Sequence, residues 1–141
     1  MIRDDILALV ARRHAAWAAR DAAALAQTHA EHGTVASPVG GVLEGREEIE
    51  RIYRLWFSAF PDVVMQQDDL LIDGDRVVLI ARMLGTHAGE FFGLPPTGRR
   101  VEVQVAHLMT VADGVVVDER RIYDFTGVLV QVGVLKAKPT A

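Results

Sequence analysis

Residues 101–125, VEVQVAHLMTVADGVVVDERRIYDF, contain two valine-rich runs that meet at Asp113 and Gly114. Alternation of apolar and polar residues is typical of β-strands, and an Asp-Gly pair between two such runs favours a tight hairpin. Two earlier runs, 62–72 and 76–87, are likewise separated by an Asp-Gly pair. The second half of the chain therefore predicts four antiparallel strands.

Helical patterns come mostly before these strands. The clearest is 46–60, REEIERIYRLWFSAF, whose apolar residues recur at helical spacing and whose last residue is followed by proline. Further helices are expected at 2–19, at 22–31 with Asp21 as the cap and Gly33 as the end, and at 127–135 with Thr126 as the cap. Residues 34–44 indicate an irregular strand or a loop near a sheet edge.

Helices followed by antiparallel strands indicate an α+β fold. We expect one domain over residues 1–141, with 136–141 as a loose tail. A twisted sheet curling around the 46–60 helix would make a cone with one open mouth, and a small ligand could bind on its concave side.

Composition excludes several classes of protein. The chain has no cysteine and a net charge of -4, so disulfides and thiolate metal sites are excluded and nucleic acid is not an expected partner. No apolar run reaches ~18 residues, and the first residues lack a signal-peptide pattern, so we expect a cytoplasmic protein without membrane contact. His29 and His32 have helical i, i+3 spacing, but no third ligand completes a metal site, and we expect no metal.

Alternation assigns the side chains of the last two strands to faces. His107 falls in an apolar row, and counting back from the hairpin places it opposite about residue 120. Asp124 then shares the inward face with Arg120, on the strand beside His107 but offset from it, so that a bulge would be needed to join them. Asp124 and His107 could be an acid–base pair in an apolar pocket. Alternatively, Asp124 caps the final helix and His107 is a core residue.

Aromatic side chains of the helices could form the pocket wall, the core, or both: Trp17, Tyr53, Trp56 and Phe60. Arg120 is a charged residue at an inward position. It either pairs with an acid such as Asp118, contacts an anionic group of a substrate, or lies in solvent if the register slips by one residue.

Three stretches, 45–62, 85–101 (GTHAGEFFGLPPTGRRV) and 123–133 (YDFTGVLVQVG), resemble the SnoaL-like polyketide cyclase family of the nuclear-transport-factor-2-like (NTF2-like) superfamily. The resemblance implies helices wrapped by a curved, mostly antiparallel sheet. It also implies that residues 85–100 link two long strands near the pocket mouth, where Phe91 and Phe92 cover apolar surface.

Cyclases of this family close a ring by intramolecular aldol condensation without metal or cofactor, as lyases or isomerases. The resemblance gives the base to Asp124 and the neighbouring histidine to His107, with a polyketide-like apolar substrate held by Trp17, Tyr53, Trp56, Phe60 and Arg120. Members often have His-Trp where this chain has Glu119 and Arg120, which puts a polyaromatic substrate in question.

The superfamily also uses its pocket for other purposes. An epoxide hydrolase or isomerase of the NTF2-like type is one alternative, in which Arg120 and Asp124 with Asp118 would form an acid–arginine–acid cluster. A non-catalytic small-molecule-binding protein is another. Because the 101–111 strand carries apolar residues on both faces, among them Ala106 and Leu108 on the outer one, we expect a homodimer packed sheet to sheet.

Overall fold

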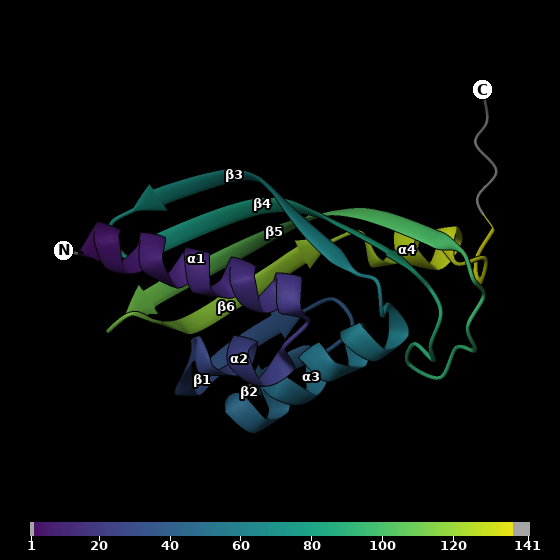
Figure 1. Ribbon diagram of the computed structural model, residues 1–141, viewed down its shortest axis with the longest axis horizontal. Helices are drawn as coiled ribbons and strands as arrows, with labels where there is room; N and C mark the ends of the chain where they lie inside the picture. Colours follow the sequence, from purple (N-terminus) through teal and green to yellow (C-terminus); the bar gives the residue numbers. More distant parts are fainter. Residues whose placement is uncertain (1, 137–141) are drawn as a thin grey trace.

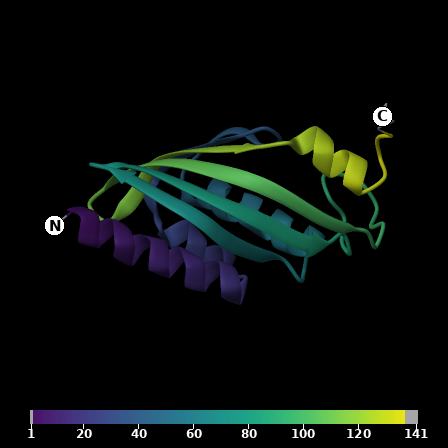
Figure 2. The same ribbon diagram turned by 90° about the horizontal axis from the view of Figure 1, so that it is seen from above.

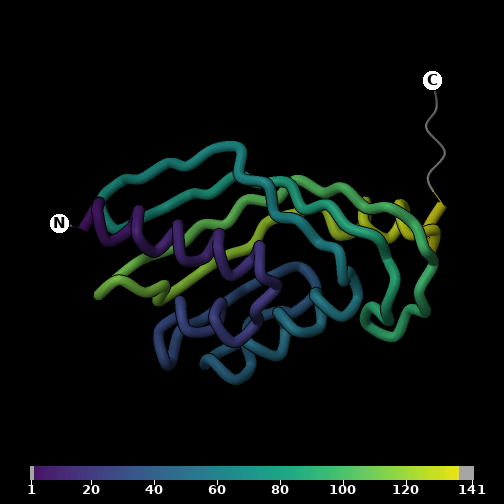
Figure 3. The backbone as a smooth tube through the Cα atoms, in the orientation of Figure 1, coloured from purple at the N-terminus to yellow at the C-terminus, as the bar shows by residue number. Residues whose placement is uncertain are grey.

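The computed structural model of the protein describes residues 2–136 and has a six-stranded curved sheet with helices (Figures 1 and 3). The α+β class is therefore confirmed. The tail expected at 136–141 lies almost wholly outside the described residues. The elements are, in chain order, α1 (Ile2–Ala19), α2 (Ala22–Gln27), β1 (His29–Ser37), β2 (Gly41–Glu44), α3 (Arg46–Ala59), β3 (Val64–Asp73), β4 (Arg76–Thr86), β5 (Arg100–Ala112), β6 (Val115–Tyr123) and α4 (Phe125–Gln131).

The sheet has the order β2-β1-β6-β5-β4-β3, and every pair is antiparallel except β1 with β6. All four predicted strands are present. Residues 34–44 form the end of β1 and the short edge strand β2. Figure 1 shows α1 running along the long strands and α4 at the far end of the sheet, and Figure 2 shows the same arrangement from above. None of the helices within residues 2–136 is long and apolar enough to cross a bilayer.

The second helix is shorter than predicted. It ends at Gln27, where the Thr28 side chain donates to the Leu25 carbonyl at 2.5 Å, and β1 starts at His29. The chain turns there because His29 pairs with Val116 at the centre of the sheet. His29 is therefore buried in a strand while His32 is exposed, so the helical i, i+3 spacing predicted for this pair was wrong.

A bulge in β6 changes which of its side chains face inward. Near the turn, Val111 pairs with Val116, as simple counting predicts, but Thr110 already pairs with Asp118. One extra residue, Val117, is thus inserted into β6, and every residue beyond it moves to the opposite face. His107 consequently pairs with Arg121 rather than with residue 120.

The segment between β4 and β5 closes one end of the molecule against α3. The backbone N–H groups of Ala88 and Gly89 both donate to the Ala59 carbonyl at 3.1 Å, at the end of α3. A side chain at Gly89 would lie 2.0 Å from the Ser58 carbonyl oxygen, so only glycine fits there. Phe91 is buried and packs against Trp56, with ring centroids 5.0 Å apart, whereas Phe92 is 40% exposed. Of the two phenylalanines, Phe91 is the one that supports the core.

Candidate active site

A cavity lies between the helices and the sheet, with about 430 Å³ of empty space counted out to its mouth. Its walls are mostly apolar, and four polar side chains join them. The cavity is lined by Trp17, Ser37, Trp56, Met65, Met83, Val103, Val105, His107, Arg121 and Tyr123. An apolar cleft with a few convergent polar groups is the usual form of a small-molecule site.

Two neighbouring strands bring the polar groups of the cavity together. Alternation along β5 turns Val103, Val105 and His107 to the inner face, and all three are buried. The bulge in β6 turns Arg121 and Tyr123 to the same side. The register then sets Arg121 directly opposite His107.

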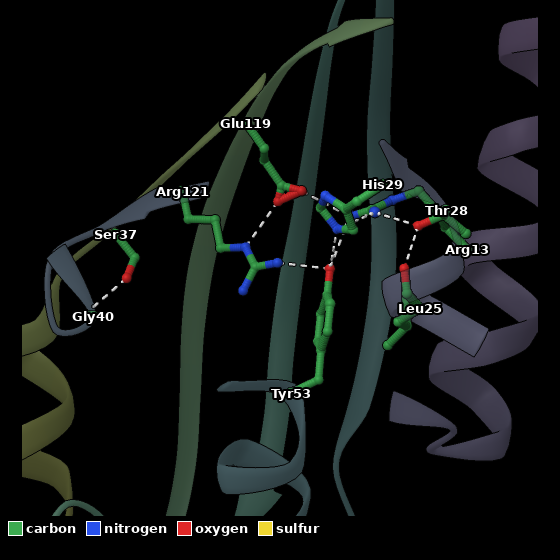
Figure 4. A network of polar contacts seen from close by, with 9 residues as sticks. All are labelled: Arg13, Leu25, Thr28, His29, Ser37, Gly40, Tyr53, Glu119 and Arg121. Atoms are coloured by element: carbon green, nitrogen blue, oxygen red, sulfur yellow. Dashed lines mark hydrogen bonds and ion pairs between the residues drawn. The ribbon is translucent and has the colours of Figure 1, made fainter. Parts of the chain in front are cut away.

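A buried network of charged side chains holds the Arg121 guanidinium in place (Figure 4). Arg121 Nε donates to Glu119 Oε2 at 2.8 Å, and Arg13 Nη2 donates to Glu119 Oε1 at 2.9 Å. Glu119 is fully buried, and the two arginines are 9% and 3% exposed. Because both oxygens of one carboxylate are bound, α1 and β6 hold the arginine of the cavity in one position.

Tyr53 on α3 is also part of this network. Its hydroxyl accepts a hydrogen bond from Arg121 Nη2 at 2.6 Å and lies 3.0 Å from His29 Nε2. Two of the three guanidinium nitrogens of Arg121 are thus bound to protein. The third, Nη1, has no hydrogen-bond partner within residues 2–136, and Figure 4 shows it directed away from the network.

Burial keeps His29 and His107, which lie next to this network, uncharged. Burial is the largest influence on His107 and lowers its pKa to about 4, with Arg121 and Arg13 acting in the same direction and Glu119 opposing. The same desolvation lowers the pKa of His29 to about 3. For Glu119, burial acts to raise the pKa, but Arg121 and Arg13 outweigh it and hold that pKa well below its ordinary value. At neutral pH the site therefore contains two cations, one anion and two neutral imidazoles.

Two polar atoms on cavity-lining residues have no partner within the described part of the chain. They are His107 Nδ1 and the Tyr123 hydroxyl. Burial also raises the pKa of Tyr123 to about 12, against the opposing effect of Arg121, which keeps this hydroxyl protonated. Buried polar groups in native proteins are usually hydrogen-bonded, so these two buried atoms are exceptions beside the cavity.

The predicted acid–base pair does not meet in this structure. Asp124 is exposed, precedes α4, and accepts the backbone N–H of Gly127 at 2.9 Å. It lies beyond the bulge, so its predicted inward orientation was wrong, and it does not line the cavity that contains His107. The alternative in which Asp124 caps the final helix is confirmed, whereas Thr126, also predicted as the cap, lies within the helix.

The predicted binding residues divide into three groups. Trp17 and Trp56 line the cavity. Tyr53 and Phe60 are fully buried behind its wall, Tyr53 in the polar network and Phe60 stacked on Trp56. Arg120 is exposed on the outer face, so of its three predicted positions the one in solvent after a register slip is confirmed and the inward ones are wrong.

The ionic cluster differs from the one expected for epoxide hydrolysis. That alternative requires two acids around one arginine, whereas here two arginines surround one acid, Glu119. The carboxylate is also fully buried and does not line the cavity. The arrangement therefore favours stabilisation of negative charge over activation of water by a pair of carboxylates.

Sequence reasoning missed Arg13, Glu119 and Arg121. One signal was available for Arg13, which follows Ile6, Leu9 and Val10 at the spacing of the buried face of α1. For Glu119 and Arg121, the bulge at Val117 leaves no trace in the alternation of apolar residues, and the pattern alone pointed to the opposite face.

Helices enclosed by a curved sheet, with a cavity between them, are the arrangement of the NTF2-like fold. A solved NTF2-like protein from Burkholderia thailandensis superimposes with a TM-score of 0.73 at 26% identity, over 90% of this chain and 95% of the other. A solved protein from Catenulispora acidiphila with a ketosteroid-isomerase-like fold superimposes with a TM-score of 0.78 at 22% identity, over 93% of this chain and 97% of the other. The sequence profile of the SnoaL-like polyketide cyclases matches residues 8–132, and the chain belongs to this family.

Individual relatives agree with this assignment. The chain is 43% identical over 51 residues to a nogalonic acid methyl ester cyclase of Streptomyces nogalater, a match that covers 36% of this chain and 38% of the relative. The match thus spans little more than a third of that curated protein. A solved structure described as a SnoaL-like polyketide cyclase, from Jannaschia sp. CCS1, has a TM-score of 0.84 and 27% identity, with 94% of each chain covered.

Proposed function

We propose that this protein is a cofactor-independent enzyme of the cyclase type, which enolises a polyketide-like small molecule and closes a ring within it. Membership in the SnoaL-like family supports the cyclase type. The observation that carries the proposal is the cavity itself, whose apolar walls meet a fixed cation, Arg121, and an uncharged imidazole, His107. These are the groups that enolate chemistry requires of a protein.

In the proposed reaction, a ketone oxygen of the substrate accepts a hydrogen bond from Arg121 Nη1. The proton on the adjacent carbon passes to the neutral imidazole of His107, and the electron pair of the C–H bond becomes the enolate. The enolate carbon then attacks a second carbonyl of the same molecule, which forms the C–C bond. The new alkoxide takes the proton back from His107, so the overall reaction is an isomerisation.

Electrostatics support this assignment of roles. Arg121 is held by Glu119 and Tyr53 before any substrate binds, so its charge needs no reorganisation as the enolate forms. A low pKa makes His107 a weak base, and the substrate must therefore be an acidic carbon acid, such as a 1,3-dicarbonyl. The protonated imidazole would have the Glu119 carboxylate as a favourable partner, since Glu119 acts to raise the pKa of His107.

The base that the family resemblance suggested, Asp124, is less well placed for this step. Its carboxylate is exposed and occupied as a helix cap, whereas His107 lines the cavity. We therefore propose His107 as the group that moves the proton, and a structural role for Asp124.

Deuterium exchange tests the proposal directly. A β-keto ester built on two fused rings is incubated in D₂O, and NMR follows exchange at the carbon between its carbonyls, with and without protein. We expect the protein to accelerate exchange, His107→Ala to lose about 10²- to 10⁴-fold of the acceleration, and the matched control Asp124→Asn to keep it. Exchange at the buffer rate with the wild type, or equal losses in the two variants, would overturn the proposal.

A further inference from the structure

Charge in the buried network is not balanced. Arg13 on α1 and Arg121 on β6 are cations, and Glu119 on β6 is the one carboxylate bound between them. The other titratable groups around them are His29 on β1, His107 on β5, Tyr53 on α3 and Tyr123 on β6. Both imidazoles are neutral at pH 7, so the two arginines exceed the one carboxylate by one positive charge.

Within the described residues, Arg121 is the only cation of this network that lines the cavity between the helices and the sheet. Arg13 donates to Thr28, Tyr53 and Glu119 and lines a second, neighbouring cavity rather than this one. Arg121 lines it, and its Nη1 is the guanidinium nitrogen without a protein partner. Since a buried unpaired ion is costly, an anion at Nη1 would complete the network.

We infer that Arg121 Nη1 selects an anionic oxygen: a flat apolar body docks there either a carboxylate oxygen or the enolate oxygen that forms once its proton has passed to His107. The inference deepens the proposed function, on which it rests for the identity of the site. It makes a free acid or the enolate of a 1,3-dicarbonyl the tightest ligand, and an ester without an acidic carbon a poor one.

The walls of the cavity fit the apolar part of such a ligand. Trp17 and Trp56 line it from α1 and α3, and Met65 and Met83 line it from β3 and β4. Indole faces and thioether side chains pack well against a planar ring system. The Tyr123 hydroxyl and His107 Nδ1, which have no partner within the described residues, are buried on residues that line the same cavity.

Naphthoate and its methyl ester form a matched pair of probes, and quenching of tryptophan fluorescence reports binding because the two tryptophans line the cavity. We expect naphthoate to bind about 10- to 100-fold more tightly than the ester, because hydrogen bonds to charged groups are the stronger ones. Arg121→Gln should remove this preference. The control Arg120→Gln makes the same change of charge on the outer face of the same strand and should leave the preference intact.

Several results would overturn the inference. One is an ester that binds as tightly as the acid, and another is an equal loss of preference in the Arg120 variant. A third is a tyrosinate absorbance band in the ligand-free protein at neutral pH, which would show that the surplus charge is already compensated. If Arg121→Gln fails to fold, the comparison of acid with ester in the wild type and in Arg121→Lys decides instead.

The two proposals fail separately. Selective naphthoate binding without accelerated deuterium exchange would refute the enolising enzyme and leave the oxyanion site. Accelerated exchange with equal affinity for acid and ester would do the reverse.

Discussion

Replacing Glu119 by glutamine should destabilise this protein more than any surface change. The substitution keeps the size of the side chain but removes the one carboxylate between Arg13 and Arg121, which approach it at 2.9 and 2.8 Å in a fully buried setting. Two guanidiniums would then face each other without a counter-charge. Removing one partner of a buried ion pair costs about 3–5 kcal/mol, which lowers the melting temperature of a chain this size by roughly 10–15 °C.

Urea denaturation at neutral pH, followed by far-ultraviolet circular dichroism, measures this loss. Asp118→Asn is the matched control: it removes a carboxylate one position away, where the side chain is exposed and accepts from Thr34 at 2.6 Å. The control should stay within about 0.5–1 kcal/mol of the wild type. If Glu119→Gln loses less than about 1 kcal/mol, or no more than the control, the buried network does not have the electrostatic role given to it here.

Three further predictions concern acid, capping and assembly. His29 and His107 have pKa values of about 3 and about 4 in the folded protein, below the ordinary 6.5, so the unfolded chain binds protons first as the pH falls. The free energy of unfolding should therefore fall as the pH drops from about 6.5 towards 4. Equal stability at about pH 7 and about pH 5 in urea titrations would contradict this. Asp124→Ala should cost about 1 kcal/mol in thermal melts while the exchange rate is retained, as expected for a helix cap. Ile122 is 57% exposed on the outer face of the sheet, and we expect it to lie in the predicted homodimer interface. Light scattering should show a dimer that Ile122→Asp dissociates. A monomeric wild type at micromolar concentration would rule the dimer out.

The sequence predicted most of the fold because local patterns and the fold agree. The 46–60 helix has apolar residues at regular spacing, and α3 is found at Arg46–Ala59 with those residues buried. Asp113 and Gly114 both adopt positive φ, as the predicted hairpin turn requires. The second helix was placed too long because alanine-rich sequence favours helix on propensity, whereas pairing of His29 with the central strand decides the actual boundary.

The site was harder to predict than the fold. Trp17, Trp56 and His107 were identified because helical spacing and strand alternation are regular up to their positions. Beyond Val117, one inserted residue reverses the faces of β6, so that Arg120 and Asp124, which simple alternation places inward, lie on the outer side and Arg121 lies inward. Such a bulge depends on tertiary packing across three strands and has no local signature in the sequence.

A crystal structure of the protein with a fused-ring 1,3-dicarbonyl bound tests the central claim most directly. The ligand should lie between Trp17 and Trp56, with one oxygen within hydrogen-bond distance of Arg121 Nη1 and its acidic carbon next to the His107 ring. A ligand bound elsewhere, or one whose reactive carbon lies against Asp124 with Arg121 Nη1 left unoccupied, would contradict the claim.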